Sequence, residues 1–142
     1  MNDTFGLSML QSDLIKDEGY SALPYLDTAN PPNISIGVGR NLTIVGVSSD
    51  EVILMLNNDI SRATTALDLS YPWWRTLPRG AQRVMLNLVF NMGLKTFSGF
   101  VKFLGHMEKQ EWDGAIQELH NSKWYTEVGE RGPRMCARLA AL

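Results

Sequence analysis

The sequence predicts a mostly helical α+β fold, with a small β-hairpin near the N-terminus followed by a series of helices. Turn-forming residues and short apolar segments are concentrated in residues 19–47, whereas apolar residues recur at helical spacing over most of the later chain. The chain has 142 residues, of which 44% are hydrophobic, and this is enough for one compact domain with a substantial core.

A first helix is expected before the hairpin. Apolar side chains lie at helical spacing between residues 10 and 15, and Ser8 is expected to cap the helix at its N-terminus. Gly19 should end this helix directly after Glu18, because glycine readily adopts the backbone conformation that terminates helices.

The hairpin is predicted from the residues that follow. Pro24 prevents the helix from resuming, and residues 25–26 and 34–36 are expected to form two short strands. The connection from Asp27 to Asn33 is too long for a two-residue hairpin turn, so we expect a loop there.

A long helix is expected to link the hairpin to the rest of the chain. Ser48 and Glu51 have the spacing of a capping box, and apolar residues continue at helical spacing to about Leu69. Pro72 should then end the helix.

Further helices are predicted for the remaining residues. They are expected between Pro78 and Gly93, from Ser98 to Met107, from Trp112 to Leu119, from Ser122 to Tyr125, and from about Glu130 to the C-terminus. Trp112, Trp124, Met92 and the phenylalanines are expected to contribute to the core rather than to bind a cofactor.

Composition argues against several classes of protein. The net charge of −2 disfavours a nucleic-acid-binding protein, which is usually basic. Cys136 is the single cysteine and cannot form an internal disulfide, and His106 and His120 lack the spacing of metal ligands. We therefore expect no metal and no other cofactor, and we expect a monomer.

The N-terminal segment lacks the basic and continuous apolar regions of a signal peptide, and no apolar stretch is long enough to span a membrane. The sequence therefore predicts a protein that is made in a cytoplasm and does not insert stably into a membrane.

Three side chains around the predicted hairpin suggest a chemistry. Glu18 ends the first helix, Asp27 begins the loop, and Ser35 lies on the returning strand, where it could face Asp27 across the loop. A carboxylic acid on one side, with a carboxylate and a hydroxyl holding a water on the other, is the arrangement of an inverting glycosidase. Read singly, Glu18 fits a solvated helix end, and Asp27 an Asx turn, better than a catalytic role.

These residues lie in motifs that resemble those of the small phage lysozymes of glycoside hydrolase family 24, the T-even type. The N-terminal motifs are Glu18-Gly19, Tyr25-Leu26-Asp27-Thr28 and Ser35-Ile36-Gly37-Val38-Gly39-Arg40. The likeness continues in order through Asn87-Leu88-Val89-Phe90-Asn91-Met92-Gly93, Gly99-Phe100, Trp112-Asp113-Gly114-Ala115 and Ser122-Lys123-Trp124-Tyr125.

The resemblance implies a lysozyme-like two-lobe fold within one catalytic domain of residues 1–142. The hairpin lobe would comprise about residues 19–47, and the helical lobe about residues 70–142 together with the N-terminal helix. By position, the resemblance makes Glu18 the general acid and Asp27 the second carboxylate, with Ser35 in place of the hydroxyl that helps to hold the attacking water.

The resemblance also implies substrate-binding residues in the helical part. Phe90 lies where the family contacts substrate, and Asn87 and Arg131 match positions near the catalytic acid. The chain departs from the family pattern in its longer, Pro-containing loop, in serine at position 35 instead of threonine, and in Arg40 instead of histidine. Three further family contact positions carry other residue types here, namely Asn41, Phe103 and Glu118.

The predicted function is therefore hydrolysis of the β-1,4 bond between N-acetylmuramic acid and N-acetylglucosamine in bacterial peptidoglycan. By the same resemblance, the protein would accumulate in the host bacterial cytoplasm and act on periplasmic peptidoglycan after the membrane is permeabilised. Two alternatives stay open: a lytic transglycosylase, which can work with one glutamate and no water-holding carboxylate, and a non-catalytic wall-binding module.

Overall fold

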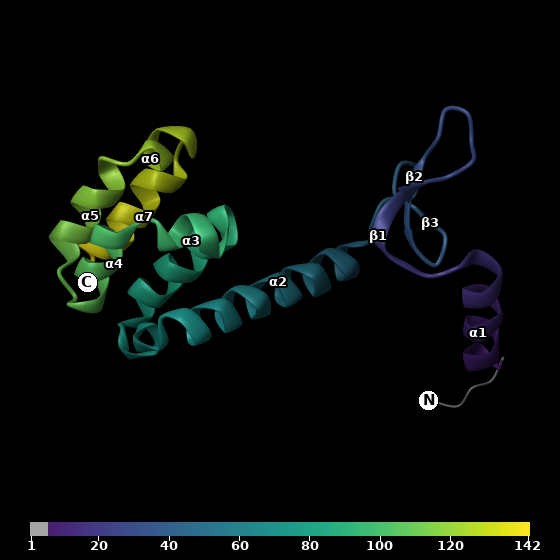
Figure 1. Ribbon diagram of the computed structural model, residues 1–142, viewed down its shortest axis with the longest axis horizontal. Helices are drawn as coiled ribbons and strands as arrows, with labels where there is room; N and C mark the ends of the chain where they lie inside the picture. The colour runs from purple at the N-terminus through teal and green to yellow at the C-terminus, as the bar shows by residue number, and fades with distance from the viewer. Residues whose placement is uncertain (1–5) are drawn as a thin grey trace. The chain divides into compact units, whose positions relative to one another are not determined.

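The computed structural model describes residues 6–142, and the chain divides into two compact units. The first unit ends at Ile53, and the second comprises Leu54–Leu142 (Figure 1). The boundary falls inside the long helix α2, which spans Ser49–Ser70. The predicted assignment of the N-terminal helix to the helical lobe stays a prediction.

The first unit consists of helix α1, Leu7–Glu18, followed by a three-stranded antiparallel sheet in the order β1-β2-β3. The strands are Ser21–Leu26 (β1), Ile34–Gly37 (β2) and Arg40–Asn41 (β3). The two predicted strands are confirmed, and β3 was not predicted because two residues are too few to carry an alternating pattern. Mixed α+β architecture is confirmed.

The end of α1 agrees with the prediction, but its start does not. Gly19 follows Glu18 with a φ of 81° and donates its backbone N–H to the Ile15 carbonyl oxygen. At the other end Gly6, in the left-handed conformation, occupies the N-cap position, so Ser8 lies inside the helix and its predicted role as N-cap is wrong.

Strand β1 contains a proline, which a central strand would not tolerate. β1 lies at an edge of the sheet, and its register with β2 is irregular between Ser21 and Tyr25, the segment that holds Pro24. Because proline cannot donate to a ladder, edge strands and bulges are where it is found.

The capping box at the start of α2 is confirmed. The Ser48 backbone N–H donates to the Glu51 carboxylate at 2.7 Å, and the Glu51 N–H donates to Ser48 Oγ at 3.2 Å. Glu51 also accepts two hydrogen bonds from the Arg40 guanidinium, at 2.8 and 2.7 Å. This bidentate pair fastens β3 to the N-terminal end of α2.

The Arg40–Glu51 pair predicts an acid-sensitive contribution to stability. Hydrogen bonds from the Arg40 guanidinium and, next in size, from the Ser48 backbone N–H lower the pKa of Glu51 from 4.5 to about 2, so the unfolded chain takes up a proton in this range that the folded chain does not. We expect the wild type to have a higher Tm than Glu51→Gln. This difference in Tm should be largest above pH 4.5 and should shrink as the pH falls towards 2. Thermal unfolding of both proteins across this range would measure it, and a constant difference in Tm would contradict the pairing.

The second unit is helical throughout its regular structure. After the C-terminal part of α2, its elements are the 3₁₀ helix η1 (Pro72–Thr76), α3 (Arg79–Ser98), α4 (Val101–Glu108), α5 (Trp112–His120), α6 (Lys123–Glu127) and α7 (Arg131–Ala140) (Figure 1). The five predicted helices after Pro78 correspond to α3 to α7, and η1 was not predicted.

The helix starts and ends predicted for this unit are confirmed only in part. Gly93 has non-helical angles, with φ 79° and ψ 159°, and interrupts α3 where its end was predicted, but the chain resumes as helix to Ser98. Ser98 does not cap α4, and its hydroxyl instead accepts a hydrogen bond from Tyr71 at 2.8 Å. Ser122 does cap α6, accepting the N–H of Tyr125 at 3.2 Å.

The core of the helical unit is apolar and closely packed. Its largest fully buried side chains are those of Trp74, Phe97, Phe103, Leu67, Met85, Leu88, Met107, Leu119, Leu139 and Val84. Burying a side chain of this kind contributes about 1.5–3 kcal/mol each, so the helices are stabilised mainly by this shared interior. The prediction of core residues is confirmed for Trp124, Phe97 and Phe103, while Trp112, Met92 and Phe100 are partly buried against the core. Phe90 is 47% exposed, and Phe5 lies outside the described residues.

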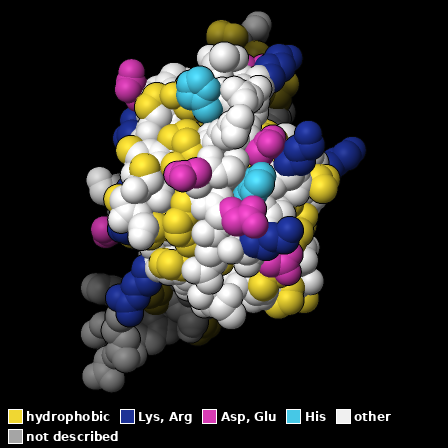
Figure 2. All heavy atoms as spheres, turned by 90° about the vertical axis from the view of Figure 1, so that its left-hand side faces the viewer, with side chains coloured by type: hydrophobic (Ala, Val, Ile, Leu, Met, Phe, Trp, Pro, Cys, Tyr) yellow, Lys and Arg dark blue, Asp and Glu magenta, His cyan; other side chains and the backbone are white. Residues whose placement is uncertain are grey.

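The surface of the helical unit carries charges of both signs. Figure 2 shows acidic and basic side chains interspersed over one face, without a large patch of either. Within residues 6–142 no single helix is long and apolar enough to cross a membrane, and only α3 and α4 taken together, across their 113° bend, pass that test of length and composition.

Candidate active site

Glu18 lies at the junction of α1 with the sheet, and its side chain contacts the β2–β3 turn. It lies next to Gly39: a Cβ atom at this glycine would lie 3.1 Å from Glu18 Oε2 and 3.5 Å from Glu18 Cβ. Glu18 is exposed to solvent. Its carboxylate is therefore accessible from outside while resting against backbone on one side.

Asp27 is held in a fixed orientation by the loop that it begins. Asp27 Oδ1 accepts the backbone N–H groups of Ala29 at 3.0 Å and Asn33 at 2.8 Å, and Oδ2 accepts from the Asn33 side-chain amide at 3.1 Å. The hydrogen bonds from Asn33, above all the one from its backbone, keep the pKa of Asp27 below its usual value. Asp27 is thus both the predicted Asx turn and a carboxylate that stays ionised near neutral pH.

Ser35 occupies the middle of the sheet and is 5% exposed. It pairs with Tyr25 on β1 and with Asn41 on β3. The expectation that Asp27 and Ser35 face each other directly is corrected by this register, since Asp27 bonds to Asn33 instead, with its N–H 2.9 Å from the Asn33 carbonyl oxygen. Asp27 and Ser35 are diagonal neighbours, and the period of two along a strand puts them on the same face.

The two carboxyl groups lie near different ends of strand β2. Asp27 is bonded to Asn33, which directly precedes β2, whereas Glu18 contacts the turn that directly follows β2. The two groups thus lie towards opposite ends of one strand, and Ser35 lies on that strand. No hydrogen bond joins the two carboxyl groups, and each has its own neighbours, Asn33 for Asp27 and Gly39 for Glu18.

The predicted substrate-binding residues lie in the second unit. Asn87, Phe90 and Arg131 line one pocket of about 360 Å³ together with Arg83, Arg138 and the apolar residues Leu56, Ile60 and Leu86. Asn87 Oδ1 is buried there without a hydrogen-bond partner among the described residues. These three residues thus surround one hollow that combines apolar surface with unpaired polar groups.

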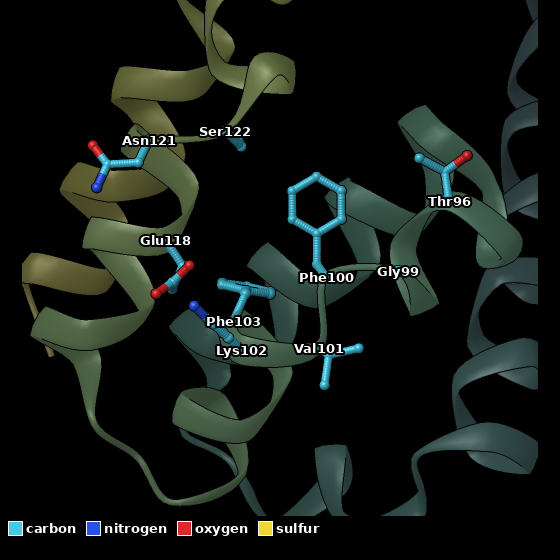
Figure 3. Close-up of a pocket in the computed structure, with 9 residues that line it drawn as sticks. All are labelled: Thr96, Gly99, Phe100, Val101, Lys102, Phe103, Glu118, Asn121 and Ser122. Carbon is cyan, nitrogen blue, oxygen red and sulfur yellow. The ribbon is translucent and has the colours of Figure 1, made fainter.

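A larger pocket of about 550 Å³ lies between α4, α5 and the segment that joins α3 to α4. Figure 3 shows the Phe100 ring standing in this hollow, with Lys102, Phe103 and Glu118 on one side of it. Phe103 and Glu118 are two of the positions where the sequence departs from the family pattern, and the structure brings them to one surface.

Gly39 and Arg40 belong to the lysozyme-like motif, but their structural roles were not predicted. Two glycines in so short a segment as Gly37-Val38-Gly39 also indicate a tight turn. The ion pair of Arg40 with Glu51 joins residues eleven positions apart and has no sequence signature. Among residues 6–142 no group of three or more His, Cys, Asp or Glu side chains is arranged to hold a metal ion.

Comparison with known proteins identifies the family. Residues 15–141 match the family model described as phage lysozyme. The chain belongs to the phage lysozyme family. It is therefore a glycosidase that hydrolyses peptidoglycan, and the resemblance drawn from its motifs is confirmed.

Individual relatives agree with the family. The chain is 27% identical to a protein of Dictyostelium discoideum described as "Probable T4-type lysozyme 2", over 91% of this chain and 92% of the relative. It is also 27% identical to "Probable T4-type lysozyme 1" of the same organism, over 87% and 89%. A third relative, the pre-baseplate central spike protein Gp5 of Enterobacteria phage T4, is 24% identical over 94% of this chain but only 28% of its own length.

Proposed function

We propose that this lysozyme cleaves the β-1,4 bond between N-acetylmuramic acid and N-acetylglucosamine with inversion at the anomeric carbon. Glu18 donates its proton to the glycosidic oxygen as the bond from that oxygen to the anomeric carbon breaks. A water held by Asp27 and Ser35 attacks the anomeric carbon from the opposite face, and its proton passes to Asp27. The products are two free sugar ends. Asp27 then releases its proton to solvent and Glu18 takes one up from solvent, which restores the starting state of the enzyme.

The single observation that carries this proposal is the separation of the two carboxyl groups along β2. In retaining enzymes the second carboxylate attacks the sugar directly and must lie close to the acid, whereas in inverting enzymes a water fits between them. Glu18 by the turn after β2 and Asp27 by the loop before it favour the second case.

The environment of each group supports its proposed role. Hydrogen bonds from Ala29 and Asn33 keep Asp27 charged, as a base that accepts a proton from water must be. Ser35 donates no hydrogen bond to any described residue, so its hydroxyl is available to a water. We further propose that Phe90, Asn87 and Arg131 contribute to binding the glycan strand, with Phe90 supplying exposed aromatic surface.

We also propose that the enzyme serves bacterial cell lysis by a phage. It would accumulate in the host cytoplasm and reach the periplasmic peptidoglycan once another protein permeabilises the membrane. Family membership supports this role, and fractionation of infected cells before and after permeabilisation would test it. Enzyme found outside the inner membrane before permeabilisation would contradict it.

Product analysis tests the chemistry. We expect mass spectrometry of digested peptidoglycan to show muropeptides with free reducing ends, and NMR during the first minutes of the reaction to show the α-anomer of the new N-acetylmuramic acid end. Release of 1,6-anhydro sugars would identify a lytic transglycosylase, and an initial β-anomer would identify a retaining enzyme. Binding to purified sacculi without release of reducing ends would identify a non-catalytic module.

A further inference from the structure

Within the first unit, Glu18 lies against the β2–β3 turn and receives no hydrogen bond. We propose that Gly39 is a positioning residue of this lysozyme, because its missing side chain lets the Glu18 carboxylate rest against the turn and so determines where the acid stands. This inference rests on the proposed role of Glu18 as the general acid.

Within the first unit, the carboxylate is restrained by packing against Gly39. No hydrogen bond or ion pair from residues 6–53 reaches the Glu18 carboxylate, and the side chain is exposed. A side chain of this kind can rotate unless packing limits it. The packing comes from Gly39, whose missing Cβ would lie 3.1 Å from Oε2 and 3.5 Å from both Cβ and Cδ of Glu18.

The turn is itself a firm support. Arg40, the residue after Gly39, donates to both Glu51 carboxylate oxygens at 2.8 and 2.7 Å and to the Gly46 carbonyl oxygen at 3.2 Å. On its other side the turn continues from β2, and Ile36 pairs with Arg40 across it. Because the turn is held from both sides, a group added at Gly39 would displace Glu18 rather than the turn.

A methyl group at position 39 would displace the acid by a small distance. At 3.1 Å the added carbon is closer to Oε2 than ordinary van der Waals contact, so the neighbour must move by a few tenths of an ångström. The atom that can move most easily is the carboxylate oxygen at the end of a flexible side chain. A misplacement of about 1 Å can cost about 100-fold in rate, so this smaller one should cost on the order of 10-fold.

Gly37, the last residue of β2, offers a matched control next to the turn. Gly37 and Gly39 both have left-handed angles, with φ of 69° and 65°, so alanine is strained at either position. A Cβ at Gly37, however, would meet nothing within 4 Å. The two alanine variants therefore share the backbone penalty and differ in the contact with Glu18.

The experiment compares wild type, Gly37→Ala, Gly39→Ala and Glu18→Gln on soluble peptidoglycan fragments, with kcat, KM and Tm measured for each. We expect the two alanine variants to lose similar amounts of Tm, and Gly39→Ala alone to lose about 10-fold in kcat with KM unchanged. If Glu18→Gln is inactive but the two alanine variants have equal kcat, the positioning role of Gly39 is wrong and the proposed function stands. If Glu18→Gln keeps wild-type activity, the proposed function is wrong, and the positioning role with it.

A stability measurement covers the case in which Gly39→Ala does not fold. Truncating Glu18 to alanine removes the atoms that the new methyl group would meet, apart from Cβ. We expect Gly39→Ala to lower Tm less in the Glu18→Ala background than in the wild type, and Gly37→Ala to lower it equally in both. Equal losses for Gly39→Ala in the two backgrounds would overturn the proposed contact.

Discussion

Glu18→Gln is expected to abolish lysis of permeabilised Gram-negative cells while the protein stays folded. The substitution keeps the size of the side chain but removes the proton that leaves with the glycosidic oxygen, and losing one acid–base group costs about 100- to 10,000-fold in rate. The fold should persist because Glu18 is exposed and forms no hydrogen bond within the first unit. Turbidity loss of the cell suspension, alongside the circular dichroism spectrum and Tm, would measure both effects.

Asp17→Asn is the matched control for this substitution. Asp17 is the neighbouring exposed carboxylate on α1 and has no place in the proposed chemistry. The two variants remove one negative charge each from adjacent positions, so a general effect of charge on binding to the wall would appear in both. Lysis at the wild-type rate by Glu18→Gln, or an equal loss in both variants, would refute the assignment of Glu18 as the acid.

The reactive residues could be predicted from the sequence because their pattern is local. Glu18, Asp27 and Ser35 lie within 18 residues, and the helix end and strands that carry them have their own signals in Gly19 and in the turn-rich loop. The residue that supports Glu18 could not be predicted in the same way. Gly39 matters through the space that it leaves empty, and only coordinates show which atoms fill that space.

Helix starts illustrate the same limit for the fold. Four serines stand at predicted helix starts, and one of them, Ser8, lies inside α1 instead of capping it. Ser48 does cap α2, because Glu51 returns the hydrogen bond, and Ser122 caps α6. Ser98 fails because Tyr71, which is 27 residues away, takes its hydroxyl as a hydrogen-bond acceptor. The sequence therefore identifies residues that can cap a helix, but their tertiary hydrogen-bond partners decide whether they do.

Asp27 poses a different problem, because it has two functions at once. Its carboxylate holds the loop through Ala29 and Asn33, and in the proposed mechanism it also accepts a proton from the attacking water. Replacement by alanine would remove both functions together. A loss of activity in that variant alone would not separate a missing base from a displaced loop.

Asp27→Asn separates the two functions. The amide oxygen of asparagine can still accept the backbone N–H groups of Ala29 and Asn33, and the Asn33 side-chain amide can turn its oxygen towards the new NH₂ group. We expect Asp27→Asn to keep a Tm close to that of the wild type and Asp27→Ala to lose more. Both should lose about 100-fold or more in kcat, because neither can accept the proton of the attacking water.

Ser35→Ala should have a smaller effect than either Asp27 variant. The hydroxyl contributes one hydrogen bond to the water, and a net hydrogen bond of about 0.5–1.5 kcal/mol corresponds to about 2- to 13-fold in rate. Steady-state rates on soluble peptidoglycan fragments would give the order. If Ser35→Ala lost more activity than Asp27→Asn at equal Tm, Asp27 would be mainly a structural residue of the loop. Another group would then have to activate the water, and the assignment of Asp27 as the general base would be wrong.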